Sequence, residues 1–326
     1  MRNGVVKVQK QEVLVHDPLR HPRKTKIRKL LWRDRYLYLL LIPAILYFII
    51  FKFAPMYGVQ IAFKDYKINL GIGGSEWVGT KYFQRLFKSS MFSRVFRNTL
   101  LLNIYSVIFG FPAPIILALM LNELRSQRYK RVMQSVVYIP HFFSWVILAG
   151  MISNLLSPSH GAVNQLYKAI SGSTEGIYFL TETKWWPTVF IISGIWKEVG
   201  WGTIIYLAAI TGIDPQLYEA AIIDGASKFR QTISITIPCL VPTIVIQLIL
   251  RMGGMMDVGM EPVLLLSNDV VREVADVFST YIYRQGVLKT QYSLTTACGL
   301  FQSVVSAILL LSTNAISKRL TGDGIW

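Results

Sequence analysis

The chain has 326 residues, of which 52% are hydrophobic and 16% are charged, and its mean hydropathy is +0.42. Soluble domains carry about 25% charged residues, so this composition argues against a soluble globular protein. The net charge is +16, and 19 of the 34 Lys and Arg residues lie in segments 1–35, 122–134, 211–236 and 317–326. Because Lys and Arg concentrate on cytoplasmic loops, these segments are expected inside the cell, and topology explains the charge better than nucleic-acid binding.

Six apolar stretches are long enough to cross a bilayer, at about 37–54, 98–121, 135–156, 187–210, 237–255 and 293–316. They are apolar all round, which disfavours a large soluble core. The predicted fold is therefore an all-α membrane protein with six transmembrane helices and with cytoplasmic N- and C-termini. A basic cytoplasmic segment (1–35), a transmembrane domain (36–316) and a short cytoplasmic tail (317–326) are expected.

Three outer segments, 55–97, 157–186 and 257–292, separate these stretches on the other side of the membrane. In the second stretch, Gly110-Phe111-Pro112-Ala113-Pro114 predicts a helix that is bent or broken in mid-membrane, with a simple packing kink as the alternative. In the last outer segment, the apolar residues of Val270–Gly286 follow helical spacing and predict one interfacial helix. Those residues are Val271, Val274, Val277, Phe278 and Tyr281.

Neither cysteines nor histidines indicate a metal site. Cys239 and Cys298 both fall inside predicted spans, without disulfide or metal-ligand spacing. The four histidines, His16, His21, His141 and His160, are scattered and form no ligand pair. We therefore expect no metal in this chain.

A polar segment, 211–238, lies between the fourth and fifth apolar stretches and has the features of a helix in water. Asp214 is a good N-cap, and Pro215 follows at the first helical position, where its missing N–H costs nothing. The residues up to Ile223 are mostly good helix formers. Gly225 permits either a left-handed turn or a tight contact, and a second short helix is predicted over Ser227–Ile233.

The surface of this predicted helix is suited to a protein partner. Ala220 and Ala221 are small and leave a flat patch, while Glu219 and Asp224 offer carboxylates to a partner's Arg or Lys. A docking surface is the simplest explanation, and an ordinary amphipathic surface loop is the alternative.

The spacing within this segment resembles the EAA loop of the inner-membrane permeases of binding-protein-dependent ABC importers. The matching residues are Glu219, Ala220, Ala221, Gly225, Ile235 and Pro238, and Ile237 stands where the family has Leu. The resemblance implies a type I ABC importer permease fold. It also implies that this loop is a coupling helix that fits a cleft on the ATP-binding subunit.

Further stretches are similar to the carbohydrate-uptake branch of that family, the maltose-permease-like and lipoprotein-associated LplB-type subunits. They are Ile61–Lys64, Trp77–Gly79, Tyr138–Trp145, Ile195–Trp201 and Thr280–Gly286. The resemblance covers nearly all of the chain beyond the basic start. It implies an importer of an oligosaccharide or polysaccharide, with an acidic, alginate-like glycan among the candidates.

The resemblance also implies partners in the inner membrane of a bacterium. The chain has no phosphate-binding loop of the Gly-x4-Gly-Lys-Ser/Thr type, so ATP and Mg are expected on two separate ATP-binding subunits. A second permease subunit, expected to be non-identical, and an extracytoplasmic solute-binding protein complete the expected assembly. The chain itself is expected to bind no cofactor and to catalyse no reaction.

Ionisable residues inside predicted spans mark a candidate cargo path, because such residues are costly in lipid. Lys197 and Glu198 are flanked by Trp196 and Trp201, which suits a sugar with apolar C–H faces and polar hydroxyls. Neighbouring residues on a helix do not face each other, so Lys197 and Glu198 are not expected to pair simply. Gln247 and Arg251 are four apart and share a helix face. Interfacial tryptophans and a snorkelling lysine are the alternative explanation.

Two other functional classes stay open from the sequence. A proton-coupled secondary transporter of a polar solute could use Lys197 and Glu198 as a relay. A membrane enzyme would need clustered catalytic groups, and no nucleophile–base pair is visible. Transport that requires ATP hydrolysis by a separate subunit distinguishes the importer from both.

Overall fold

The structure is a computed structural model that describes residues 32–321 and 324. The chain divides into two compact units, Met1–Gly58 and Val59–Trp326, which are described separately. Most of the predicted basic segment 1–35 and part of the predicted tail 317–326 lie outside the described residues.

The described part of the first unit is one helical rod. Helix α2 (Arg35–Phe48) continues through a π-helical turn (Ile49–Phe53) into α3 (Ala54–Met56). Pro43 lies inside α2, and Pro55 lies near the start of α3. The whole stretch Arg35–Phe63 is long and apolar enough to cross a membrane, as the sequence predicts.

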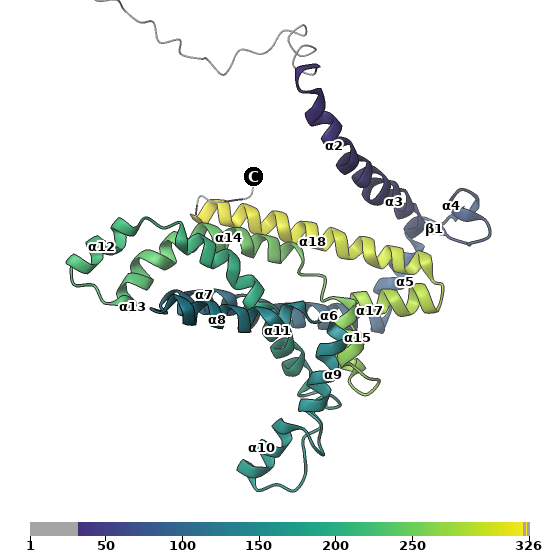
Figure 1. The fold of residues 1–326 in the computed structure, drawn as a ribbon. Helices are drawn as coiled ribbons and strands as arrows, with labels where there is room; N and C mark the ends of the chain where they lie inside the picture. The colour runs from purple at the N-terminus through teal and green to yellow at the C-terminus, as the bar shows by residue number, and fades with distance from the viewer. Residues whose placement is uncertain (1–31, 322–323, 325–326) are drawn as a thin grey trace, which may run out of the picture. The chain divides into compact units, whose positions relative to one another are not determined.

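The second unit is a set of packed helices with one small antiparallel sheet, in which β1 (Lys64–Asp65) pairs with β2 (Glu76–Trp77). Its α-helices are α4 (Gly71–Gly74), α5 (Lys81–Phe87), α6 (Ser90–Tyr105), α7 (Pro112–Asn122), α8 (Gln127–Tyr138), α9 (Trp145–Leu155), α10 (Ala162–Ser171), α11 (Trp186–Thr211), α12 (Pro215–Ile223), α13 (Lys228–Gln231), α14 (Ile237–Gly253), α15 (Met260–Leu266), α16 (Arg272–Ala275), α17 (Phe278–Ile282) and α18 (Tyr292–Thr321). Helices α12 and α13 lie at one end of this unit and α5 and α17 at the other, with α14 and α18 side by side between them (Figure 1).

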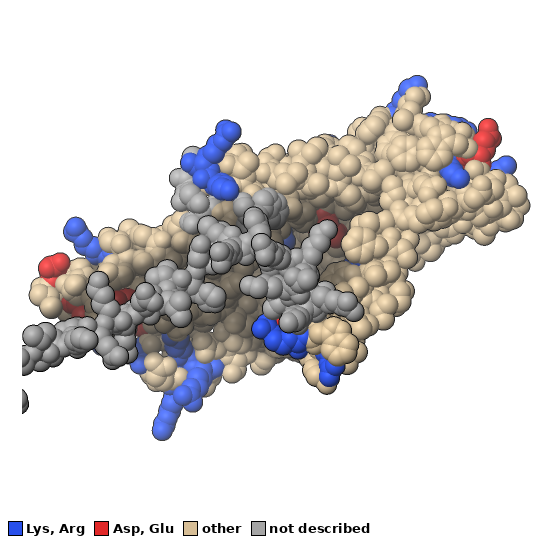
Figure 2. All heavy atoms as spheres, turned by 90° about the horizontal axis from the view of Figure 1, so that it is seen from above, with Lys and Arg blue, Asp and Glu red and all other residues tan. Residues whose placement is uncertain are grey.

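The described residues contain four helices that are long and apolar enough to cross a membrane: Arg35–Phe63, Ser90–Asn122, Lys228–Gly253 and Tyr292–Arg319. A bent pair, α8 and α9, supplies a fifth if it counts as one span. Helix α11 has 26 residues but is not among them. By length and composition, the described residues therefore support four or five spans, and the six predicted spans are not confirmed. Where Figure 2 shows described residues, they are mostly uncharged, with Lys, Arg, Asp and Glu gathered in a few places near the edges.

The prolines of the second apolar stretch shift the helix register without breaking the helix. A π-helical turn (Ser106–Gly110) joins α6 to α7, and the Phe111 N–H donates to the Ser106 carbonyl at 3.1 Å. Pro112 and Pro114 cannot donate to the preceding turn, and the wider π turn accommodates this loss. Ser90–Asn122 is therefore one long helix, so that of the predicted bend or break the break is wrong.

The third apolar stretch is not the single helix that the sequence predicts over 135–156. Helix α8 ends in a 3-10 turn (Ile139–Phe142), and α9 leaves it at an angle of 103°. Pro140 lies in that turn, and Ser144 begins the new helix, accepting from the Ile147 N–H at 3.4 Å. A local proline and a local N-cap outweigh the continuous apolar pattern.

The single interfacial helix predicted over Val270–Gly286 is also wrong. Two short helices, α16 and α17, are separated by extended backbone at Asp276 and Val277. The Phe278 N–H donates to the Thr99 hydroxyl at 3.1 Å instead of continuing α16. Val271, Val277 and Phe278 are nevertheless buried, so the apolar pattern identified core residues but not their secondary structure.

The second short helix predicted over Ser227–Ile233 is present as α13, with Ser227 as its N-cap, but it is not separate from the following span. Helix α13 continues through a π-helical turn (Thr232–Thr236) into α14, so that Lys228–Gly253 forms one span. Pro238 lies in the first turn of α14. The π turn again accommodates a proline that cannot donate a backbone hydrogen bond.

Candidate functional site

Helix α12 is capped at both ends by its own sequence. The Asp214 carboxylate accepts from the Gln216 N–H at 2.9 Å, and Pro215 occupies the first turn. At the other end the Ala226 N–H donates to the Ala221 carbonyl at 2.8 Å, and the Gly225 N–H donates to the Ile222 carbonyl at 3.0 Å. This is a Schellman ending, and it requires a left-handed residue after the helix.

Gly225 supplies that left-handed residue. Its φ is +75°, and a Cβ built at this position meets nothing within 4 Å. Of the two alternatives predicted from the sequence, the structure therefore shows the left-handed turn rather than a tight contact within the chain. A side chain here would have room but would force the backbone into a strained conformation.

The exposed surface of this segment is more apolar than the sequence analysis anticipated. Glu219, Ala220 and Asp224 are exposed as predicted, and no residue of α12 is buried. Ile223 is 86% exposed and Phe229 is 75% exposed, and neither was singled out. Leu217 and Ile222 are also exposed, so the segment presents several large apolar side chains together.

Contacts over short sequence separations fasten α12 to the start of the following span. The Tyr218 hydroxyl and the Thr236 hydroxyl lie 2.9 Å apart, and the Gln231 amide donates to the Ala226 carbonyl at 2.9 Å. Ile235 and Pro238 belong to that span, in the π turn and in α14. These two motif residues therefore lie in the helix that anchors the loop and not on the exposed face of α12.

A cavity of about 510 Å³ lies between α7, α11 and α14. Its lining is mainly apolar and comprises Ser106, Gly110, Phe111, Pro114, Trp145, Phe190, Ile191, Gly194, Ile195, Glu198, Val199, Trp201, Gly202, Ile205, Tyr206, Gln247, Leu250, Arg251, Val258 and Pro262. Four of the six residues predicted for the cargo path line it: Glu198, Trp201, Gln247 and Arg251. Trp196 and Lys197 do not.

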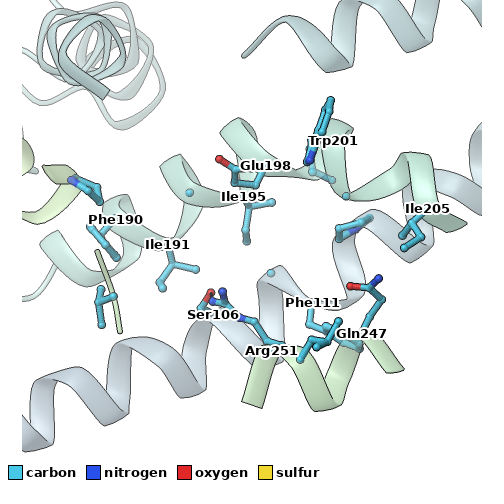
Figure 3. Close-up of a pocket in the computed structure, with 18 of the residues that line it drawn as sticks. Ser106, Phe111, Phe190, Ile191, Ile195, Glu198, Trp201, Ile205, Gln247 and Arg251 are labelled. Carbon is cyan, nitrogen blue, oxygen red and sulfur yellow. Dashed lines mark hydrogen bonds between the residues drawn. The ribbon is translucent and has the colours of Figure 1, made fainter. Parts of the chain in front are cut away.

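The polar groups of the cavity come from two sides. Arg251 donates to the Ser106 hydroxyl, which the π turn between α6 and α7 presents. In Figure 3, Ser106, Gln247 and Arg251 lie on one side of the labelled isoleucines, while Glu198 and Trp201 project from the other side of α11. The apolar lining thus includes one cation (Arg251), one carboxylate (Glu198), one amide (Gln247) and two indoles (Trp145 and Trp201), with Glu198 and Trp201 directed away from Arg251 and Gln247.

Lys197 is directed at the break between α8 and α9. Its ammonium donates to the His141 carbonyl at 2.6 Å and to the Phe143 carbonyl at 2.8 Å, and the residue is 8% exposed. The same ammonium lies 3.9 Å from the Glu198 carboxylate. The sequence analysis expects no simple pair of Lys197 and Glu198, but the two form an ion pair at 3.9 Å because both long side chains bend toward the same break.

His141 was missed by the sequence analysis and joins the predicted residues here. Its Nδ1 lies 2.9 Å from the Glu198 carboxylate, and its ring stacks on Trp201 at 4.5 Å and 4°. Since 57 positions separate His141 from Glu198, only the fold brings them together. Pro140 beside it, within an otherwise apolar span, was the local indication of irregular backbone at this point.

Polar contacts within the outer segments hold these segments together. Asp276 is buried and accepts from Arg284 at 2.7 Å and from the Thr280 hydroxyl at 2.7 Å. Near β1, the Tyr82 hydroxyl donates to Asp65, and this hydrogen bond lowers the pKa of that carboxyl. Among the described residues, no cluster of three or more His, Cys, Asp and Glu side chains could hold a metal ion.

Comparison with known proteins places the chain in one family. Residues 110–322 match the family described as the binding-protein-dependent transport system inner membrane component. Because the match covers more than half of the chain, the chain belongs to this family of inner-membrane transport subunits. Its members are permeases and not enzymes.

Two relatives from Bacillus subtilis (strain 168) are similar over nearly their whole length. The chain is 47% identical to Protein LplB over 294 residues, which is 90% of this chain and 92% of LplB. It is 45% identical over 304 residues to the polygalacturonan/rhamnogalacturonan transport system permease protein YteP, which is 93% of this chain and 94% of YteP.

Two solved structures share the fold. One is a bacterial ABC transporter involved in the import of the acidic polysaccharide alginate, with a TM-score of 0.83 and 44% identity, covering 91% of this chain and 99% of that one. The other is a bacterial alginate ABC transporter in complex with an alginate pentasaccharide-bound periplasmic protein. Its TM-score is 0.84 at 44% identity, over 92% of this chain and 100% of that one. The chain therefore has the type I ABC importer permease fold.

Proposed function

We propose that this subunit carries an oligosaccharide or polysaccharide, of an acidic, alginate-like kind, from an extracytoplasmic binding protein into the cytoplasm. The observation that supports this cargo most directly is Arg251, a cation on the lining of an otherwise largely apolar cavity. A uronic acid polymer presents a carboxylate, hydroxyls and apolar C–H faces, and the cavity offers a complement to each. The relatives that handle polygalacturonan and alginate support the same class of cargo.

The contacts proposed for that cargo are Glu198, Trp201, Gln247 and Arg251. Arg251 would bind carboxylates, and Gln247 and Glu198 would bind hydroxyls. Trp201 has its ring stacked on His141 on one face, and it is 50% exposed, which leaves ring surface for a sugar.

The energy of ATP hydrolysis would be transmitted to this subunit through α12. We propose that Glu219, Ala220, Ala221, Asp224 and Gly225 form the coupling helix, with Ile223 and Phe229 as apolar anchors for an ATP-binding subunit. In this scheme two such subunits bind ATP and Mg, and their closure moves α12 and shifts the spans between inward- and outward-open states. A ligand can drive such a change only through different affinities for the two states.

The topology that suits this scheme has six spans, with both termini cytoplasmic. Helix α11 would be the additional span, since its 26 residues reach across the bilayer despite Lys197 and Glu198. Figure 1 places α12 and the end of α18 on one side of the second unit and α17 on the other, which supports this arrangement. A second, non-identical permease subunit would close the cargo path.

Reconstituted vesicles provide the test. The chain would be assembled with a second permease, the ATP-binding subunits and a binding protein, and uptake of an alginate pentasaccharide would be measured with and without ATP inside. Uptake that needs ATP hydrolysis and survives an uncoupler supports the proposal. Uptake that is independent of ATP and is lost with an uncoupler would instead support the proton-coupled alternative.

A further inference from the structure

The break between α8 and α9 leaves backbone carbonyls without helical partners. The last carbonyls of a helix have no intrahelical N–H, and a turn of 103° prevents α9 from supplying one. In a membrane-spanning segment water is scarce, so such carbonyls need a partner from the protein. Lys197 is that partner for His141 and Phe143.

The groups around Lys197 stabilise the positive charge of its ammonium. Its ammonium faces the carbonyl end of the α8 segment, where the helix dipole favours a cation. The Glu198 carboxylate lies at 3.9 Å, and the Trp145 ring centroid lies at 5.8 Å. With two hydrogen bonds, a nearby carboxylate and 8% exposure, Lys197 is engaged by its own chain.

The same contacts place two groups that line the cavity. Lys197 holds the backbone of His141, the His141 ring binds Glu198 through Nδ1, and its plane stacks on Trp201. Helix α11 approaches α8 closely near Lys197. This is shown by Gly200, where a Cβ would overlap the Val137 carbonyl. His141 therefore supports Glu198 and Trp201 from the side that does not line the cavity.

We propose that Lys197 is a positioning residue that clamps the α8–α9 break and, through His141, holds Glu198 and Trp201 in place for the cargo. This inference rests on the proposed function only where it assumes that Glu198 and Trp201 bind a cargo. The hydrogen bonds that Lys197 makes at the α8–α9 break do not depend on that function. It replaces the expectation that Lys197 touches the cargo. A direct contact would require the ammonium to leave both carbonyls.

The experiment compares K197M, K197R and E198Q in the assembled transporter, with W196F as the matched control. Trp196 is the neighbour of Lys197, is 39% exposed and does not line the cavity. The kcat/KM of alginate pentasaccharide uptake should fall about tenfold in K197M, because hydrogen bonds of a charged donor are lost. K197R should stay within about twofold of the wild type, since arginine can donate to both carbonyls.

A double variant separates positioning from direct contact. If Lys197 acts through His141 and Glu198, K197M combined with E198Q should lose about tenfold, as each single change does, because residues of one network are not additive. Two independent cargo contacts would instead multiply to about a hundredfold. Multiplied losses would overturn the proposal.

Two readouts need neither cargo nor uptake. Hydrogen exchange of residues 139–148 should be faster in K197M than in the wild type and unchanged in W196F. The emission of Trp201, taken as the difference from a W201F background, should change in the same direction in K197M and H141Q, because both release the stacked ring. If K197M does not insert, K197Q replaces it. Unchanged exchange and unchanged Trp201 emission would overturn the clamp even if ATP-driven uptake proceeds, whereas failure of uptake in the wild type would count against the proposed function alone.

Discussion

The hydrogen bonds of helix α12 join residues no more than 18 positions apart, whereas those around the cavity join residues separated by 54 to 145 positions. The first region can keep its shape wherever its span is anchored, because its caps lie in its own sequence. The second region exists only when α7, α8, α11 and α14 pack together. Substitutions in α12 should therefore weaken only the binding of the ATP-binding subunit, while substitutions around the cavity should weaken binding of the cargo.

The largest effect is expected from Gly225→Val. A β-branched residue at φ +75° is strained by about 1–3 kcal/mol, and the strain falls on the ending of α12. Association with the ATP-binding subunit, measured with purified components, should weaken by about tenfold to a hundredfold. Gly172→Val is the matched control, because Gly172 has φ +69° and open space but lies after α10 in an outer segment. Equal losses of association in both variants would refute the assignment of α12.

The next effect tests the cavity. Arg251→Gln removes the cation that lines it, so the KM for an alginate pentasaccharide should rise about tenfold, with association of the ATP-binding subunit unchanged. Arg272→Gln serves as the control, because Arg272 pairs with the exposed Asp269 away from the cavity. An unchanged KM in Arg251→Gln would remove the support for acidic cargo.

A smaller effect is expected from Ile223→Asn. This side chain is 86% exposed, so the substitution should not disturb the fold. Loss of an apolar anchor costs about 1 kcal/mol at an interface, so association with the ATP-binding subunit should weaken about fivefold. Ile170→Asn, at 78% exposure in α10, should leave that association unchanged. If Ile223→Asn also leaves it unchanged, Ile223 lies outside the interface.

The smallest effect is expected from Ser106→Ala. The Ser106 hydroxyl accepts from Arg251 and orients it, so its loss should raise the KM for the pentasaccharide about threefold, well below the effect of Arg251→Gln. Ser303→Ala is the control, since the Ser303 hydroxyl donates within its own helix to the Gly299 carbonyl. A loss as large as that of Arg251→Gln would mean that Ser106 itself binds the cargo.

The sequence alone determined what depends on neighbouring residues. Composition predicted a helical membrane protein, Asp214 and Pro215 predicted the start of α12, and Gly225 predicted either a left-handed turn or a tight contact, of which the structure shows the first. The spacing from Glu219 to Pro238 indicated the family, which the comparisons confirm. Helix caps and turns are local properties, so a linear pattern is sufficient to predict them.

Only the tertiary structure decided what depends on residues distant in the sequence. The break after Phe143 is stabilised by Lys197 from another helix, and Asp276 and Val277 are extended because Phe278 hydrogen-bonds to Thr99. The encounter of His141 with Glu198 likewise has no trace in the sequence pattern. Hydropathy measures how apolar a segment is, but the partner that satisfies a free carbonyl or orients a buried charge is chosen by packing in three dimensions.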